Sequence, residues 1–372
     1  MVVKCCTFEE MSLHIKSNHL RIIMVGAGVL GTITVPEILR QQKIDHLVEC
    51  YIDNDEKIWN SNIDLNGNSI IVKSMGKLTN IDSANIAILL NISRYSEILE
   101  QLNRIQNLKN VICYIMPMMC IHNFKQTEMI GALKDNQIPR IPKVIHYMWL
   151  GKQKIPLALR KCMETWTQYC PDYEIVQWNE SNYDVNKHIY MKEAYEQGAY
   201  GFIPDYARLD ILHQYGGIYL DTDVELIKSL DGLLYEEAFC GVEKWQVLNF
   251  GGCSGAVKGN EMIYHFMQSR KNIHFNNKDG SQNRRTCGYY DTRTAMKYGY
   301  QLTGKVQKIH DMNIYTSDYF HPYDYMSGRT QITRNTYSIH RFNGGWLSQK
   351  MKRENVEVQK AFEQEYLEAL KV

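Results

Sequence analysis

The sequence contains no apolar run long enough to cross a bilayer. Its most apolar stretch, VICYIMPMMCI at residues 111–121, is far shorter than the ~20 residues of a spanning helix, and a proline interrupts it. Residues 1–28 interrupt their apolar positions with charged side chains, so no signal peptide is legible. These absences predict a cytoplasmic protein without a membrane span, and they leave open peripheral contact with the inner face of the membrane.

The chain also lacks a dominant charge and a cysteine framework. With 42 basic and 41 acidic residues its formal net charge is +1, so no global field attracts nucleic acid. The ten cysteines include no C-x-x-C pair and no metal-type spacing, which predicts reduced thiols. Apolar residues make up 44% and charged residues 22%, unlike disordered chains. The sequence therefore predicts a folded protein that recognises its partners at local sites.

Two domains are expected for a chain of 372 residues. The first part alternates short apolar runs with helical patterns, which predicts βαβ units and a parallel sheet. A second composition begins near residues 135–151, where two prolines punctuate a polar stretch. We therefore predict an α/β protein with a Rossmann-like domain at residues 1–138 and a second mixed α/β domain at residues 139–372.

A glycine-rich loop follows the first strong apolar run. VGAGVLG places Gly26, Gly28 and Gly31 in a G-x-G-x-x-G pattern between a predicted strand and a predicted helix. This context is typical of nucleotide-binding loops, in which backbone N–H groups bind a pyrophosphate. Asp53 ends the next apolar run, where an acidic residue can bind a ribose hydroxyl. The other interpretation is that the glycines only pack helix against strand and that Asp53 starts a turn.

A second candidate site begins with a short helix. Pro204 and Asp205 are helix start signals and Gly216–Gly217 are stop signals, so residues 206–215 should form about three turns. Asp205 and Arg208 are spaced i, i+3 and lie on one face of that helix. In isolation, Asp205 would be a plain N-cap and Arg208 a surface cation.

An acidic pair follows this helix. Residues 218–220 are predicted to form a buried strand, and alternation along it would project Asp221 and Asp223 to the same side of the sheet. Two adjacent carboxylates repel each other unless a cation lies beside them, and Mg²⁺ or Mn²⁺ prefers such oxygen ligands. An ion held there would neutralise the charge on a departing diphosphate. The alternative is an ordinary Asp-Thr-Asp turn.

The surrounding motifs resemble a known family. Five of them stand in the order and approximate spacing of the DxD-containing glycosyltransferases of family 32: IPKVIHYMWLG, CPDYEIVQWNE, PDYARLDILHQYGGIYLDTDVEL, IYTSDYFHP and YSIHRFNGGW. The resemblance covers residues 141–347. It implies a GT-A-like fold, shared with large bacterial glucosylating toxins, and transfer of a sugar with retention of configuration. It also implies Mn²⁺ or Mg²⁺, a UDP- or GDP-sugar donor and a glycan acceptor.

The resemblance assigns roles to the acidic pair and its neighbours. Asp223 resembles the direct metal ligand of the family. Asp221 resembles the residue that contacts ribose and donor sugar and supports the metal through water. Asp205 and Arg208 match the pair that holds the donor sugar and its phosphate.

Further assignments fall on either side of this block. Trp149 resembles an aromatic that stacks on the nucleotide base, with a core tryptophan as the alternative. His340 resembles a C-terminal metal ligand, although a lone histidine is more often structural. Trp346 resembles a lid residue over the pyrophosphate. Asn249 occupies a position where the family lines its donor and acceptor pocket.

One segment departs from the family pattern. Residues 286–292 match another part of the pocket, but Tyr289 replaces the family's usual proline. The basic pair Arg284 and Arg285 precedes this segment. It is either an exposed charged loop or a contact for an anionic acceptor.

These observations lead to one functional hypothesis with three alternatives. The hypothesis is a metal-dependent retaining glycosyltransferase that extends a bacterial capsule or lipopolysaccharide glycan. The N-terminal residues GAGVLG and YIDND resemble Rossmann-like modules that precede sugar-modifying domains in bacterial polysaccharide enzymes. The alternatives are a toxin-like transferase that modifies a host protein, a sugar-nucleotide-binding module without turnover, and an oxidoreductase that works through the glycine loop.

Overall fold

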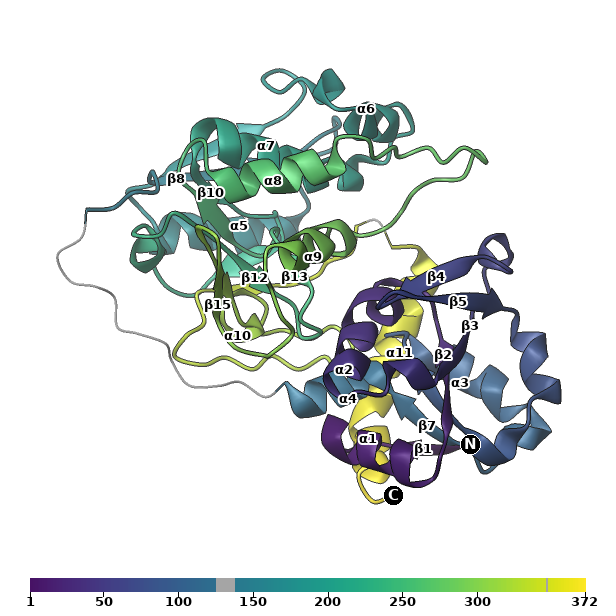
Figure 1. Cartoon of the computed structure of the whole chain (residues 1–372). Coiled ribbons are helices and arrows are strands. Elements are labelled where there is room, and N and C mark those ends of the chain that lie inside the picture. The colour runs from purple at the N-terminus through teal and green to yellow at the C-terminus, as the bar shows by residue number, and fades with distance from the viewer. Residues whose placement is uncertain (125–137, 346) are drawn as a thin grey trace. The chain divides into compact units, whose positions relative to one another are not determined.

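The computed structural model describes residues 1–124, 138–345 and 347–372, and it divides them into two compact units (Figure 1). Unit 1 consists of residues 1–124, 325–328 and 348–372. Unit 2 comprises the other described residues. The predicted boundary at residue 138 adjoins residues 125–137, which lie outside the described part of the chain.

Unit 1 is built on a mainly parallel sheet. Its order is β1-β7-β6-β2-β3-β5-β4, and β4 alone pairs antiparallel with its neighbour in the described part of the unit. Strands β2 and β6 are central and almost fully buried, because helices cover a parallel sheet on both faces. The strands are β1 (Val2–Lys4), β2 (Arg21–Val25), β3 (Val48–Ile52), β4 (Asn62–Leu65), β5 (Asn68–Lys73), β6 (Ile86–Leu90) and β7 (Ile112–Ile115).

The helices of unit 1 place its glycine loop at a reversal of strand order. The chain leaves β2 toward β3 through α2 and leaves β6 toward β7 through α3, and these two helices lie on opposite sides of the sheet (Figure 1). Ligands of such sheets bind where the order reverses, at the carboxyl ends of the strands. The helices are α1 (Phe8–Ser17), α2 (Val35–Gln41), α3 (Tyr95–Asn103), α4 (Met116–Asn123) and α11 (Gln349–Ala369).

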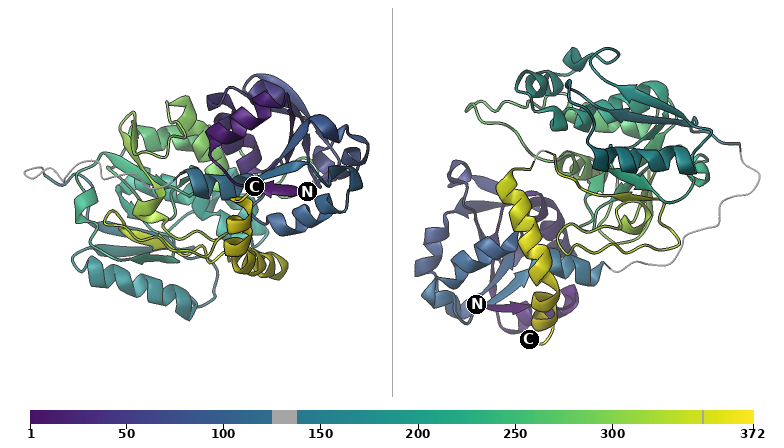
Figure 2. Two further views of the ribbon diagram at one scale, coloured as in Figure 1. Left: turned by 90° about the horizontal axis from the view of Figure 1, so that it is seen from below. Right: turned by 180° about the vertical axis from the view of Figure 1, so that it is seen from behind.

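The C-terminal helix α11 belongs to unit 1, which corrects the predicted second domain of residues 139–372. It crosses one face of unit 1 (Figure 2) and buries Val358, Phe362 and Ala369. The Cys5 N–H donates to the Ala369 carbonyl at 2.8 Å, and His122 Nδ1 lies 2.7 Å from the Tyr366 hydroxyl. The chain therefore returns to its first domain after completing the second.

Unit 2 is built on a mixed sheet of eight strands within the described residues. Their order is β15-β16-β12-β14-β10-β8-β9, with β13 paired to β12. β8 pairs parallel with β9 and β10, whereas β14 runs antiparallel to β10 and β12. The strands are β8 (Val144–Met148), β9 (Glu174–Trp178), β10 (Gly217–Tyr219), β12 (Ala238–Val242), β13 (Leu248–Asn249), β14 (Ser254–Ala256), β15 (Gln307–Ile309) and β16 (Met312–Tyr315).

A small second sheet lies beside the main sheet of unit 2. It pairs β11 (Val224–Leu226) antiparallel with β17 (Ser338–His340). Helix α5 packs on β11, and the Trp166 indole N–H donates to the Val224 carbonyl at 2.8 Å. The helices of unit 2 are α5 (Leu157–Tyr169), α6 (Ile189–Glu196), α7 (Pro204–Tyr215), α8 (Glu261–Arg270), α9 (Cys287–Lys297) and α10 (Ser317–Phe320).

The predicted fold class is confirmed. Unit 1 has the parallel sheet of a Rossmann-like domain, and unit 2 has the mixed α/β arrangement predicted for a GT-A-like domain. Within the described residues, no helix combines the length and the apolar character needed to span a membrane.

Candidate active site

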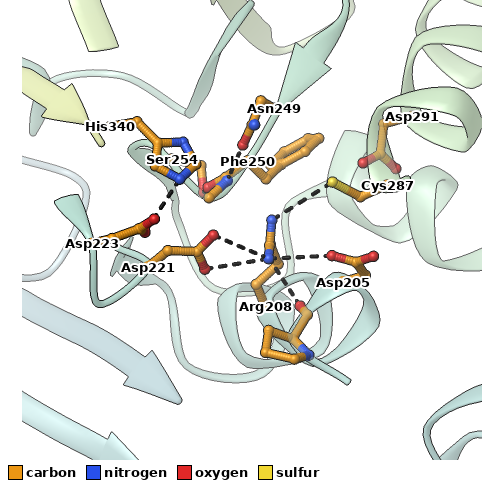
Figure 3. A network of polar contacts seen from close by, with 12 residues as sticks. Asp205, Arg208, Asp221, Asp223, Asn249, Phe250, Ser254, Cys287, Asp291 and His340 are labelled. Atoms are coloured by element: carbon orange, nitrogen blue, oxygen red, sulfur yellow. Dashed lines mark hydrogen bonds and ion pairs between the residues drawn. The ribbon is translucent and has the colours of Figure 1, made fainter. Parts of the chain in front are cut away.

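Helix α7 positions the first two side chains of the site. Pro204 begins the helix, and Gly216, with a φ of 72°, ends it. Arg208 lies one turn after Asp205, and its guanidinium Nη2 is 3.3 Å from Asp205 Oδ1. The same Nη2 lies 3.3 Å from Asp221 Oδ1, so one buried cation joins two carboxylates from different elements (Figure 3).

The acidic pair lies in a turn. Strand β10 ends at Tyr219, and the chain turns through Asp221, Thr222 and Asp223 before β11 begins. Strand alternation therefore does not bring the two carboxylates to one side, which corrects the geometric part of the prediction. The Asp221 N–H donates to the Gly251 carbonyl at 2.9 Å. A Cβ on Gly251 would lie 2.0 Å from Asp221 Oδ2, so only glycine fits against this carboxylate.

His340 completes an oxygen and nitrogen cluster with the acidic pair. Pairing of β11 with β17 places His340 opposite Val224, and His340 Nε2 lies 3.3 Å from Asp223 Oδ1. Asp221, Asp223 and His340 each offer a ligand atom, and these atoms lie within 4.8 Å of one another. Two carboxylates and an imidazole form a donor set that suits Mn²⁺, so the residues present fit the expected divalent ion.

Electrostatic shifts reflect this clustering. Burial raises the pKa of Asp223, but His340 and the Asn343 N–H lower it more strongly, to about 2. Burial lowers the pKa of His340, but the Asp223 carboxylate raises it, and the net pKa lies above its ordinary value. In the absence of a cation, the two side chains therefore form a charged pair.

Asp205 titrates nearer to neutrality than an ordinary carboxyl group. Burial raises the pKa of Asp205 to about 6, although Arg208 and Arg270 lower it in part. Burial lowers the pKa of Arg208, but Asp221 raises it, and the guanidinium stays charged. A carboxyl group with a raised pKa beside a fixed cation is typical of functional sites.

A buried ion pair between Arg270 and Asp291 holds the backbone of Asp205 and Cys287 in place. Arg270 ends α8, and its Nη2 lies 2.6 Å from Asp291 Oδ1 on α9. Arg270 Nη1 also donates to the Asp205 carbonyl at 2.9 Å, and Nη2 donates to the Cys287 carbonyl at 3.1 Å. The pair therefore fixes the first turn of α7 against the first turn of α9.

Cys287 lies at the other end of the network from His340 (Figure 3). Arg208 Nη1 donates to Cys287 Sγ at 3.9 Å. Burial raises the pKa of the Cys287 thiol well above its ordinary value, so the group stays protonated. Cys287 therefore lines the site as an uncharged thiol and is not a nucleophilic thiolate.

Of the remaining predicted site residues of unit 2, Asn249 contacts the network around Arg208 and Asp221, whereas Trp149 does not. Asn249 joins the network, because its Oδ1 accepts from the Gly251 N–H at 2.8 Å while its Nδ2 donates to Glu243. Trp149 is half-buried and donates its indole N–H to the Gln153 carbonyl at 2.8 Å, outside the network in the described part of the chain. Trp346 lies outside the described residues.

The glycine loop of unit 1 has two structural glycines and one without a structural constraint. Gly26 has a φ of 97°, and a Cβ on Gly31 would lie 2.1 Å from the Gly26 carbonyl oxygen. A Cβ on Gly28 would meet no heavy atom within 4 Å. Asp53 Oδ2 accepts from the Ala27 N–H at 2.8 Å, so the carboxylate faces the loop. A side chain at position 28 would therefore extend into open space.

Sequence reasoning missed Gly251 and Arg270 as contributors to the site, and it gave Asp291 no role of its own, although Asp291 lies in the segment 286–292 that was matched to the pocket. All three come from segments far from the acidic pair, and their contacts depend on tertiary packing. The double glycine of NFGGCSG was a usable signal for Gly251, because adjacent glycines in a buried stretch mark close approach of a backbone. No local pattern pointed to the pairing of Arg270 with Asp291.

The family comparison agrees with this geometry. Residues 156–240 match the family described as the glycosyltransferase sugar-binding region containing DXD motif. The matched stretch includes Asp205, Arg208, Asp221 and Asp223, whereas His340 lies beyond it. The part of the chain that carries the acidic pair is therefore similar to a glycosyltransferase sugar-binding region, and the match supports a transferase.

Individual relatives match over short stretches. A stretch of 109 residues is 33% identical to inositol phosphoceramide mannosyltransferase 3 of Schizosaccharomyces pombe and covers 28% of this chain and 30% of that protein. A stretch of 158 residues is 27% identical to Subversion of eukaryotic traffic protein A of Legionella pneumophila and covers 34% of this chain and 24% of that protein. The chain thus spans less than a third of either relative's length.

Among solved structures, the chain is similar to one titled PaToxG Glycosyltransferase. The aligned region covers 42% of this chain and 69% of that chain, with 18% sequence identity and a TM-score of 0.35.

Proposed function

We propose that the protein is a divalent-metal-dependent, retaining glycosyltransferase that moves a sugar from a UDP- or GDP-sugar to a glycan acceptor. One observation carries the proposal: Asp221, Asp223 and His340 offer ligand atoms within 4.8 Å of one another, and Arg208 joins this cluster to Asp205. A bound nucleotide sugar needs such an arrangement, because its diphosphate requires a cation and its sugar requires hydrogen-bonding groups beside it.

Asp223, Asp221 and His340 are the residues that would hold Mn²⁺ or Mg²⁺. A bound divalent ion supplies neutralising charge for a departing diphosphate. The chain contributes the fixed positions of its ligands: the Asn343 N–H holds Asp223 Oδ2 at 2.8 Å, and the Gly251 carbonyl holds the backbone of Asp221. Such pre-organisation reduces the rearrangement needed during the reaction.

Asp205 and Arg208 are proposed to bind the donor sugar. Ion pairs with Asp205 and Asp221 fix the position and orientation of the Arg208 guanidinium. Its positive charge is therefore held in place beside the sugar and its adjoining phosphate. The ionised Asp205 carboxylate accepts hydrogen bonds from sugar hydroxyls. We assign retention to attack by the acceptor on the face that the leaving group vacates, because the network presents no separate carboxylate as a nucleophile.

The proposed acceptor is a growing bacterial surface glycan, capsule or lipopolysaccharide, at the cytoplasmic face of the membrane. The support for this setting is the resemblance of the N-terminal residues GAGVLG and YIDND to modules of bacterial polysaccharide enzymes. A second candidate is a toxin-like transferase that acts on a host protein, and the match to Subversion of eukaryotic traffic protein A favours it. The two candidates differ in acceptor and share the proposed donor chemistry.

Unit 1 is proposed to bind a nucleotide at its glycine loop. The open space at Gly28 and the position of Asp53 beside the loop support this proposal. The loop follows β2, next to the reversal of strand order, where such sheets bind ligands.

The direct test is a panel of UDP- and GDP-sugars incubated with the folded protein and either Mn²⁺ or Mg²⁺. We expect hydrolysis of one or more donors that depends on the metal and stops on chelation with EDTA. Release of the nucleoside diphosphate is measured by a coupled assay. If every donor stays intact with both metals, the protein is a binding module without turnover.

A further inference from the structure

A second imidazole lies beside the proposed metal ligand His340. His321 directly follows α10 and is fully buried, and its ring centre is 5.5 Å from that of His340. The Phe342 ring stacks on His340 at 4.1 Å and lies 6.0 Å from His321, so the three rings form one group. His321 therefore belongs to the immediate surroundings of the metal ligands, although the ligand cluster itself does not include it.

Two glycines make room for the His321 ring. A Cβ on Gly252 would lie 2.1 Å from His321 Nε2, and a Cβ on Gly241 would lie 3.1 Å from His321 Nδ1. The Ser338 hydroxyl donates to the Gly252 carbonyl at 3.0 Å, and Ser338 lies in β17, the strand that carries His340. Close backbone approach thus fixes His321 relative to that strand.

Three imidazole nitrogen atoms of this histidine pair have no hydrogen-bond partner among the described residues. They are His340 Nδ1, His321 Nδ1 and His321 Nε2, and each atom is almost completely buried. The Val242 backbone acts on His321 electrostatically but makes no well-formed hydrogen bond with it. Buried polar atoms without partners are rare, because each one costs free energy, so these three atoms require an explanation.

The two rings have complementary hydrogen-bonding needs once an ion is bound. His340 Nε2 faces Asp223 at 3.3 Å and is the nitrogen that would hold the ion, so Nδ1 then carries the proton. Burial lowers the pKa of His321 well below its ordinary value, and nearby His340 and Lys244 lower it further, so the ring is neutral. A neutral imidazole has one acceptor nitrogen. A donor and an acceptor that both lack partners therefore lie in neighbouring rings.

We propose that His321 is a positioning residue for the metal site, in which one buried water links the His340 Nδ1–H to a ring nitrogen of His321. This inference rests on the proposed function and adds the residue that sets the tautomer and ring orientation of the metal-binding histidine. Buried waters typically bind polar atoms that would otherwise lack partners. The competing acceptor is the Glu243 carboxylate, whose Oε1 accepts from Asn249 Nδ2 at 2.8 Å.

The test measures Mn²⁺ affinity without turnover, from the electron paramagnetic resonance signal of free Mn²⁺. His321→Leu removes the acceptor and should raise the Kd for Mn²⁺ by at least about tenfold, because groups that orient metal-binding histidines have effects of this size. His321→Gln is the matched control, since its amide oxygen can still accept, and it should bind Mn²⁺ nearly as well as the wild type. A role limited to packing would weaken both variants alike.

A double-mutant cycle separates orientation of His340 from a general effect on the fold. In a His340→Gln background, His321→Leu should leave the affinity that Asp221 and Asp223 retain unchanged, because the histidine it orients is gone. Three results overturn the inference: a wild-type Kd in His321→Leu, as expected if Glu243 is the acceptor; equal losses in His321→Leu and His321→Gln; or a further loss in the double variant. A wild type that binds no Mn²⁺ overturns the proposed metal dependence as well, whereas the other three results leave it standing.

Discussion

His340 Nε2 lies 3.3 Å from Asp223 Oδ1, although the two residues belong to distant parts of the sequence. The antiparallel pairing of β11 with β17 creates this contact, because it sets His340 opposite Val224, directly after the acidic pair. The small second sheet is therefore what turns an Asp-Thr-Asp turn into a set of ligands for a divalent ion. Disruption of that pairing should affect the metal site before it affects the main sheet.

Asp223→Asn should abolish metal-dependent turnover. The change preserves volume but removes a charged ligand, and we expect donor hydrolysis to fall by at least about a hundredfold, since a metal supplies several kcal/mol of charge stabilisation. Glu225→Gln is the matched control, because Glu225 lies on the same chain segment but pairs with Arg341 outside the cluster. Initial rates at saturating Mn²⁺ measure both. Equal rates in wild type and Asp223→Asn would contradict the assignment.

Asp205 should give the protein a distinctive pH dependence of stability. Its pKa is raised by burial from 3.8 to about 6, so between these values the folded protein binds a proton that the unfolded chain has lost. The stability that Asp205 contributes is therefore present at low pH and is lost as the pH rises toward 6. The free energy of unfolding of Asp205→Asn, relative to wild type, should rise by about 2 kcal/mol between pH 4 and pH 6.

Urea unfolding followed by tryptophan fluorescence measures this difference, because the tryptophans at positions 149, 166, 178 and 245 report on unit 2. A constant difference between the two proteins across this pH range would show that Asp205 titrates like an ordinary carboxyl group.

Removing one partner of the Arg270–Asp291 pair should lower the free energy of unfolding strongly, whereas replacing both residues with apolar side chains should lower it little. Arg270→Met leaves the Asp291 carboxylate buried without its partner, which costs about 3–5 kcal/mol. Arg270→Met/Asp291→Leu should recover most of this stability, since no buried charge then remains. Both variants lose the hydrogen bond to the Asp205 carbonyl, so donor affinity should stay reduced in both. A double variant as unstable as the single one would refute the argument.

Two glycines of the unit 1 loop should respond differently to alanine. Gly31→Ala places a Cβ 2.1 Å from the Gly26 carbonyl oxygen and should destabilise the unit. Gly28→Ala meets no heavy atom within 4 Å and should leave the melting temperature unchanged while it weakens binding of ADP or NAD. Calorimetric titration of both nucleotides measures the binding. If neither binds the wild type, the loop only packs helix against strand.

Local signals in the sequence predicted the elements around the site closely. The predicted helix at residues 206–215 corresponds to α7 (Pro204–Tyr215), because a proline at the first turn and a glycine at the end act through backbone conformation alone. The return of α11 to unit 1 was not predictable. Its buried positions, Val358, Phe362 and Ala369, indicate an amphipathic helix, but no pattern within a helix identifies the surface it covers.

The sequence predicted that Asp221 and Asp223 lie close together, but the structural reason for it was wrong. Alternation along a strand was expected to align Asp221 with Asp223, whereas a turn and the carbonyl of Gly251 set their positions. The spacing of Asp205 and Arg208 did predict their contact, since residues three apart on a helix are neighbours. Arg270 reaches the site from α8, and such long-range contacts leave no mark in the local sequence.

The most direct test of the central claim is pulsed electron paramagnetic resonance of the protein with one equivalent of Mn²⁺ and a nucleoside diphosphate. The account predicts bound Mn²⁺ with a nitrogen coupling from the His340 imidazole, which disappears in His340→Gln. Failure of the wild type to bind Mn²⁺, or a nitrogen coupling that persists in His340→Gln, would contradict it.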